Sequence, residues 1–155
     1  MTYSRLLASV SLFVFALAAF PVQAQPMWNR AFGYQIAELL RSPDAALQED
    51  AMRVFIEVAD RQDPNVNLRP AARALLDVYA TSSESTHRIM AVIALSKIDD
   101  VRSYTTLLAN AQGEMNAQTR RTILYAVAAS RSIQSPLVAT AFNQLLAQDR
   151  LYGSR

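Results

Sequence analysis

One histidine and no cysteine limit the metal and nucleophile chemistry that this 155-residue chain could carry. A metal at His87 would need carboxylates as its other ligands, and none lies at a fitting helical spacing from it. Asp99 and Asp100 are at the far end of the helix that we predict to contain His87. We therefore expect His87 to be a structural residue near a helix start, with pH sensing or ligand binding as the alternatives.

Two pairs of adjacent carboxylates could in principle serve as general acid and base, namely Glu49-Asp50 and Asp99-Asp100. Consecutive residues on a helix point about 100° apart, so the side chains of Glu49 and Asp50 diverge. Asp99-Asp100 is more simply a corner between two helices. No serine lies in a G-x-S-x-G pattern, and the three glycines are too far apart to form a phosphate-binding loop. We therefore expect no enzyme activity, no cofactor and no metal.

Arginine supplies nearly all of the positive charge, and Lys97 is the single lysine. Guanidinium groups favour fixed pairing with carboxylates. Once Arg5 is removed with the leader described below, 14 basic residues face 13 acidic ones, whereas nucleic-acid binders need a concentrated excess of positive charge. A basic stripe of Arg88, Arg120 and Arg121 could still line one side of the molecule, but we expect it to contact a protein or peptide and no nucleic acid.

The N-terminal 24 residues have the composition of a cleavable secretory signal peptide. One positive charge at Arg5 precedes an apolar run over residues 6–20, which is shorter than the about 20 residues of a membrane span. Small residues at Val22 and Ala24 then fit a signal-peptidase site. We expect cleavage after Ala24, export to the periplasm or medium, and no stable membrane insertion afterwards; the alternative is an uncleaved anchor.

Hydrophobic residues recur with helical period almost everywhere after residue 25, and no segment alternates with period two for long. We therefore predict an all-α domain over residues 25–148 with seven antiparallel helices and a flexible tail over 149–155. The first four helices are expected at 27–41, 43–62, 69–80 and 87–98. The other three should begin near Val101, after Asn116 and at Ser135-Pro136.

Local residue types predict where several of these helices start and stop. Ser42 and Ser85 are expected to cap the second and fourth helices, and Asn116 to cap the sixth. Pro136 suits the first turn of the seventh helix, where a missing N–H costs nothing. Gly113 is expected to end the fifth helix in a left-handed conformation.

Three windows of the chain superpose when Leu47, His87 and Thr119 are taken as equivalent, at spacings of 40 and 32 residues. Apolar residues recur four and eight positions later in each window. Here the chain resembles the HEAT-repeat family over about residues 34–131. The matching residues of its second-helix pattern are Arg88, Ala91, Leu95 and Ile98 in one window and Arg120 and Val127 in the next.

The same comparison shows three departures from the HEAT pattern. His87 and Thr119 stand where the pattern has an apolar residue. Gln48 stands where the first window would have its arginine, and the aspartate that often pairs with the repeat arginine has no clear equivalent before Arg88 or Arg120. The resemblance implies a short right-handed α-solenoid, made of three helix pairs and a C-terminal capping helix. It also implies a concave helical surface that binds proteins or peptides.

From these observations we expect an exported, non-enzymatic protein–protein interaction module. Its partner contacts are predicted to be Arg88, Arg120 and Arg121, on the inner-helix face. The alternative is a structural or assembly subunit of an envelope complex that docks through an end helix. Apolar residues near the two ends would then form the docking surface, namely Trp28, Phe32, Tyr34 or Phe142.

Overall fold

The computed structural model describes the backbone of residues 25–153 and the side chains of residues 31–151. The predicted leader lies outside this range, as does the side chain of Trp28. Within the range the chain forms seven α-helices, two short 3-10 helices and no strand, so the all-α prediction is confirmed. The α-helices are α2 (Gln25–Leu40), α3 (Ala45–Asp60), α4 (Ala72–Thr81), α5 (Ser85–Ile98), α6 (Val101–Ala111), α7 (Ala117–Ala128) and α8 (Pro136–Gly153). The 3-10 helices are η2 (Arg69–Ala71) and η3 (Arg131–Gln134).

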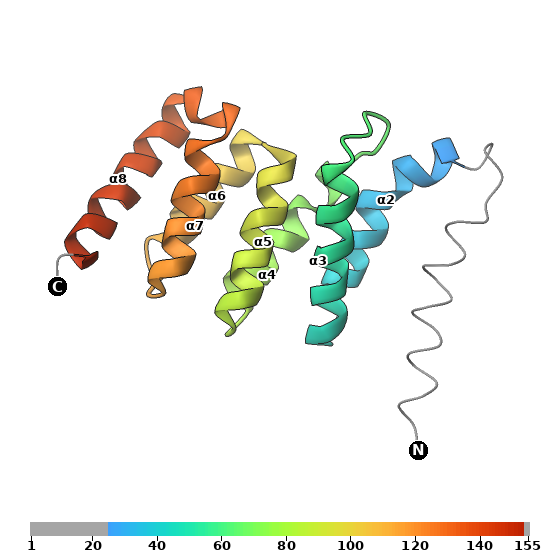
Figure 1. The fold of residues 1–155 in the computed structure, drawn as a ribbon, viewed down its shortest axis with the longest axis horizontal. Helices are drawn as coiled ribbons and strands as arrows, with labels where there is room; N and C mark the ends of the chain where they lie inside the picture. Colours follow the sequence, from blue (N-terminus) through green and yellow to red (C-terminus); the bar gives the residue numbers. More distant parts are fainter. Residues whose placement is uncertain (1–24, 154–155) are drawn as a thin grey trace, which may run out of the picture.

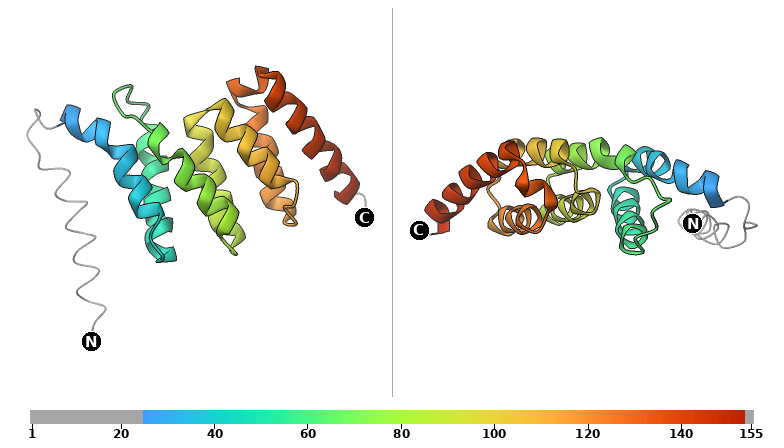
Figure 2. Two further views of the ribbon diagram at one scale, coloured as in Figure 1. Left: turned by 180° about the vertical axis from the view of Figure 1, so that it is seen from behind. Right: turned by 90° about the horizontal axis from the view of Figure 1, so that it is seen from above.

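The helices lie in two layers (Figure 1). Seen from above, α2, α4, α6 and α8 form one layer, which bows outward, and α3, α5 and α7 lie beneath it on the concave side (Figure 2). Each helix of the pairs α2/α3, α4/α5 and α6/α7 contacts its pair mate and the nearest helix of the same layer in the next pair. Three helix pairs are therefore stacked in a row, with α8 at the end against α6 and α7.

The core lies between the two layers, and the repeated positions of the sequence fill it. The residues four and eight positions after Leu47, His87 and Thr119 are buried in all three windows: Ala51 and Phe55, Ala91 and Leu95, Ile123 and Val127. Leu75, Leu107 and Leu145 enter the same core from the other layer. Since one face of every helix is covered in this way, apolar burial is shared along the whole row.

The first helix pair contributes an aromatic contact and an unusually close approach of backbone. Phe32 stacks on Phe55 with ring centroids 6.3 Å apart and is buried, so the alternative that Phe32 forms a docking surface is wrong. The next residue, Gly33, faces the loop before α4. A Cβ at this position would collide with the backbone carbonyl of Asn67 and the ring of Pro70. Glycine is therefore needed here to let α2 and that loop touch.

Several predicted helix ends differ from the observed ones. Asp44, and not Ser42, caps α3, because its Oδ1 accepts hydrogen bonds from the amides of Ala46 and Leu47 at 2.9 and 3.4 Å. The prediction for Ser85 is also wrong: Ser85 is the first residue of α5, and Glu84 precedes it in the capping position without a side-chain bond.

Gly113 does not adopt a left-handed conformation, since α6 already ends at Ala111 and Gln112 remains helical in its dihedral angles. The left-handed residues of the described chain are Gln62 and Asp99. The caps predicted after α6 are confirmed: Asn116 Oδ1 accepts from the Thr119 amide at 2.9 Å, and Pro136 is the first residue of α8.

The predicted flexible tail is wrong for residues 149–153. Helix α8 continues through Gly153, and Asp149 is tied to α7 by an ion pair with Arg120 at 3.1 Å. Between residues 25 and 153 no helix is both long and apolar enough to cross a membrane.

Candidate partner-binding surfaces

Arg88, the first of the three arginines predicted to contact a partner, is used inside the molecule. Its Nε and Nη2 bind the two carboxylate oxygens of Glu114 at 2.8 and 3.1 Å. Its Nη1 donates to the backbone carbonyls of Ser82 and Ser83, just before its own helix. Glu114 also accepts from the amide of Asn116 at 2.8 Å. The guanidinium thus joins the loop before α5 to the corner between α6 and α7.

Arg120 repeats this arrangement one repeat later. It is 5 % exposed, its Nη1 donates to the carbonyls of Glu114 and Met115, and its Nε binds Asp149 of α8 at 3.1 Å. The donors of Arg88 and Arg120 thus face carbonyls and carboxylates of the same chain. Their predicted role as partner contacts stays a prediction.

Gln48 occupies the equivalent position in the first repeat and also donates to carbonyls of the loop before its helix. Its Nε2 donates to the carbonyls of Leu40 and Ser42 at 3.0 and 2.8 Å. The bonds of Gln48 to Ser42, Arg88 to Ser82 and Arg120 to Glu114 all reach back six residues. The three windows therefore share one local geometry as well as one apolar pattern.

The carboxylate partners of these arginines were missed at the sequence level, because we sought them before each arginine. Glu114 lies 26 residues after Arg88, and Asp149 lies 29 residues after Arg120. Glu114 belongs to the following repeat and Asp149 to α8. Ion pairs between successive units are therefore present, and their carboxylates come later in the sequence than the arginines. The similar separations were the one regularity that could have indicated them.

His87 and the carboxylate pairs occupy structural positions. His87 is buried at the start of α5, with Nε2 3.5 Å from Glu49 Oε2, which fits its predicted structural role. Glu49 and Asp50 both bind Arg53 on the surface of α3. No group of three His, Asp or Glu side chains within the described part of the chain could hold a metal ion.

The Asp99-Asp100 pair forms the corner between α5 and α6, as predicted. Asp99 is left-handed and its carboxylate accepts from the Arg131 amide at 3.1 Å and from the Ser132 hydroxyl at 2.9 Å, which anchors η3. Asp100 caps α6 by accepting from the amide and hydroxyl of Ser103. Both carboxylates therefore hold backbone, and they do not face a common site.

Arg121 is the one predicted contact residue that remains on the surface. It is exposed on α7, and its side chain has no hydrogen-bond or ion-pair partner among residues 31–151. Tyr125, one turn further along α7, is 77 % exposed. Ile93, which is 37 % exposed on the neighbouring α5, occupies the repeat position equivalent to Tyr125. The concave layer thus carries exposed apolar side chains at repeated positions beside an unpaired cation.

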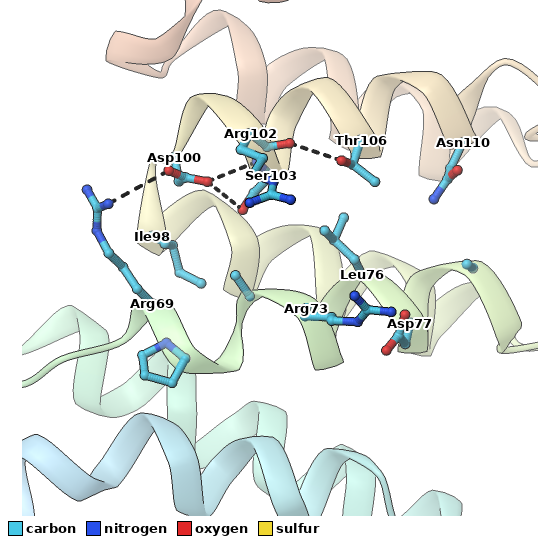
Figure 3. Close-up of a pocket in the computed structure, with 13 residues that line it drawn as sticks. Arg69, Arg73, Leu76, Asp77, Ile98, Asp100, Arg102, Ser103, Thr106 and Asn110 are labelled. Atoms are coloured by element: carbon cyan, nitrogen blue, oxygen red, sulfur yellow. Dashed lines mark hydrogen bonds and ion pairs between the residues drawn. The ribbon is translucent and has the colours of Figure 1, made fainter.

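A second surface feature is a groove of about 580 Å³ between α4 and α6, in the outer layer (Figure 3). Its apolar lining includes Leu76 and Ile98, whose inner atoms also pack on the core. Arg73 stands on the α4 wall and Arg102 on the α6 wall. Nothing in the sequence pattern indicated this groove, because its walls come from helices of two different pairs.

Comparison of the chain with family models, with curated proteins and with solved structures finds no match.

Proposed function

We propose that this chain is an exported, non-enzymatic interaction module built as a short HEAT-like α-solenoid, which presents its α3–α5–α7 layer to a protein or peptide partner. The export part of the proposal is supported by the composition of residues 1–24. The repeat part is supported by the shared bonds of Gln48, Arg88 and Arg120 and by the two-layer arrangement of the helices.

The exposure of Tyr125 is the observation that carries the binding role. A tyrosine in the middle of a helix is normally half-covered, whereas this one is 77 % exposed. Tyrosine and arginine are the side chains that most often dominate the binding energy of protein interfaces, and here Arg121 lies one turn before Tyr125. A partner segment that covers the ring with an apolar side chain and offers a carboxylate to Arg121 would satisfy both groups.

Affinity capture with the chain from residue 25 onward, followed by titration of the retained protein, tests this proposal. The Tyr125→Ser variant should weaken binding by at least about tenfold, the loss expected when an interface anchor is truncated. Leu137→Ser is the matched control, because Leu137 on α8 is 68 % exposed and lies on a different surface. Equal retention by wild type and Tyr125→Ser, or no specific retention at all, would contradict the proposal.

The alternative role, a structural or assembly subunit that docks through an end helix, is favoured by one observation. Leu137 and Leu151, near opposite ends of the last helix α8, are both largely exposed. If binding or self-association is lost in Leu137→Ser and kept in Tyr125→Ser, the end helix is the docking element. Light scattering at tens of micromolar then separates self-assembly from docking on a larger complex.

A further inference from the structure

The groove between α4 and α6 continues into a second hollow of about 480 Å³. The two hollows share Ala80 and Asn110 in their linings, so they adjoin each other along the outer layer, and we refer to them together as the channel. Arg69 and Asp100 lie at its beginning. Gly113 and Met115 lie at its end, where Met115 is almost fully exposed.

The dimensions of this channel suit an extended peptide. The ten residues of α4 give a length of about 15 Å at 1.5 Å per residue, which an extended segment of about five residues spans at 3.3 Å per residue.

The charges at the beginning of the channel favour a carboxylate ligand. Three guanidinium groups line this part of the groove, from Arg69, Arg73 and Arg102. The side chains of Arg73 and Arg102 have no hydrogen-bond or ion-pair partner among residues 31–151, and they stand on opposite walls (Figure 3). An anion placed between them would be held from two sides, and arginine binds carboxylates through paired N–H groups.

Three carboxylates of the channel oppose this charge, and their positions differ. Glu114, in the second hollow, is paired with Arg88 at 2.8 Å. Asp100 is already engaged, because it accepts from Ser103 at 3.0 and 2.9 Å and lies 3.9 Å from Arg69. Asp77 lies one turn after Arg73 on the same wall and has no side-chain partner among residues 31–151. Asp77 is therefore the group that would repel an acidic ligand.

We propose that this channel binds an extended acidic segment of a partner protein, with a carboxylate of that segment between Arg73 and Arg102 and its chain running over Leu76 toward Met115. The proposal is independent of the concave layer, since the channel lies in the outer layer and shares no residue with the surface around Tyr125.

The probe is a fluorescent, end-blocked peptide of about six residues, rich in glutamate with one central leucine, titrated by anisotropy. A peptide with every glutamate replaced by glutamine is the ligand control. The acidic peptide should bind, and Arg73→Gln and Arg102→Gln should each weaken it by at least about tenfold. Asp77→Asn should tighten it several-fold, because a like charge is removed.

Arg53→Gln is the matched protein control, because Arg53 is an exposed arginine on α3 in the other layer and should leave the affinity unchanged. Circular dichroism of each variant confirms that the helices are intact. The proposal is overturned if the glutamine peptide binds as tightly as the acidic one, or if the groove variants and Arg53→Gln behave alike. Equal binding of a single-stranded oligonucleotide would also overturn it, because the channel would then select charge alone.

Discussion

The first repeat and the two later repeats bind the equivalent loop carbonyl, six residues back, through different side chains. Gln48 donates to Leu40 and Ser42 with a neutral amide, and its bonds stay within the first pair and its loop. Arg88 and Arg120 donate to the equivalent carbonyl six residues back and to the carbonyl five residues back. Each also binds a carboxylate of the next element. A guanidinium has five donors against two for an amide, so an arginine can bind its own loop and its neighbour at once.

The ion pairs between successive helix pairs differ in the same way. Between α3 and α5 the cross-connections are the pairs of Glu49 with His87 and of Asp60 with Lys97, which are more exposed on their acidic side. Between α5 and the corner that joins α6 to α7 the connection is buried, since the side chain of Glu114 is only 6 % exposed. Removing one partner of a buried ion pair leaves a charge that water cannot solvate.

The Arg88→Met variant should therefore have the largest effect on stability. Methionine keeps the apolar stem but leaves Glu114 without its cation and the Ser82 and Ser83 carbonyls without a donor. The free energy of unfolding, measured in urea, should fall by about 3 to 5 kcal/mol. The exposed Arg53→Met variant is the control and should lose less than about 1 kcal/mol. Equal losses in the two variants would show that the buried ion pair contributes no more to the free energy of unfolding than an exposed one.

The Arg120→Met variant should come next, with a loss of about 2 to 3 kcal/mol. Its effect is smaller because the side chain of Asp149 is 20 % exposed and can be partly solvated when the arginine is gone. Hydrogen exchange should show faster opening at the C-terminal half of α8, which this bond ties to α7. Unchanged protection there would mean that apolar packing alone holds α8.

Alkaline pH should destabilise the folded chain, because two buried tyrosines have raised pKa values. Burial and then the neighbouring Glu114 raise the pKa of Tyr79, and burial together with Asp99 raises the pKa of Tyr104 to about 12. The unfolded chain loses these protons near pH 10 while the folded chain keeps them, so folding becomes less favourable as pH rises above 10. The loss is up to about 1.4 kcal/mol per pH unit for each tyrosine.

Urea unfolding at pH 9 to 11, with tyrosinate absorbance as a second readout, measures this loss. Tyr79→Phe should be less stable than wild type or equal to it at neutral pH, and should show a shallower decline above pH 10. Parallel declines in the two proteins would contradict the assignment to Tyr79.

Gln48→Ala should cost about 1 kcal/mol, because two loop carbonyls lose neutral hydrogen bonds and no buried charge is exposed. Gln118→Ala on the exposed side of α7 makes the same change of residue type without those bonds and is the control. A loss in Gln48→Ala as large as that of Arg88→Met would remove the contrast between the two regions.

Installing the charged arrangement in the first repeat should give the smallest effect. Ser82 stands six residues before Arg88, as Glu114 stands six residues before Arg120, so Ser82→Glu with Gln48→Arg reproduces the later pair. The double variant should be more stable than the sum of its single variants by about 0.5 to 1 kcal/mol. A coupling energy of zero would show that the first junction has a different spacing.

Local patterns in the sequence predicted much of this architecture. Helical periodicity and the repeat alignment of Leu47, His87 and Thr119 identified the helices and their buried faces, and Asn116 and Pro136 marked two starts correctly. The prediction for Ser42 was wrong because Asp44, two residues later, is an equally good cap. The end of α8 was placed too early, and Asp149 in the missed part of the helix binds Arg120. The first error arose where two neighbouring residues can both cap a helix, and the second where the next contact of the helix is with a residue far away in the sequence.

The sequence by itself determined the helices, their apolar faces and the equivalence of Gln48, Arg88 and Arg120, because such features depend on residues within one or two turns of each other. Only the tertiary structure decided that Arg88 and Arg120 bind groups of this chain, while Arg73, Arg102 and Arg121 have no side-chain partner among residues 31–151. The reason is that a guanidinium takes whichever carboxylate or carbonyl the packed helices bring within about 3 Å. That choice depends on the distances between residues that are 26 or more positions apart in the sequence. Such distances cannot be inferred from a local sequence pattern.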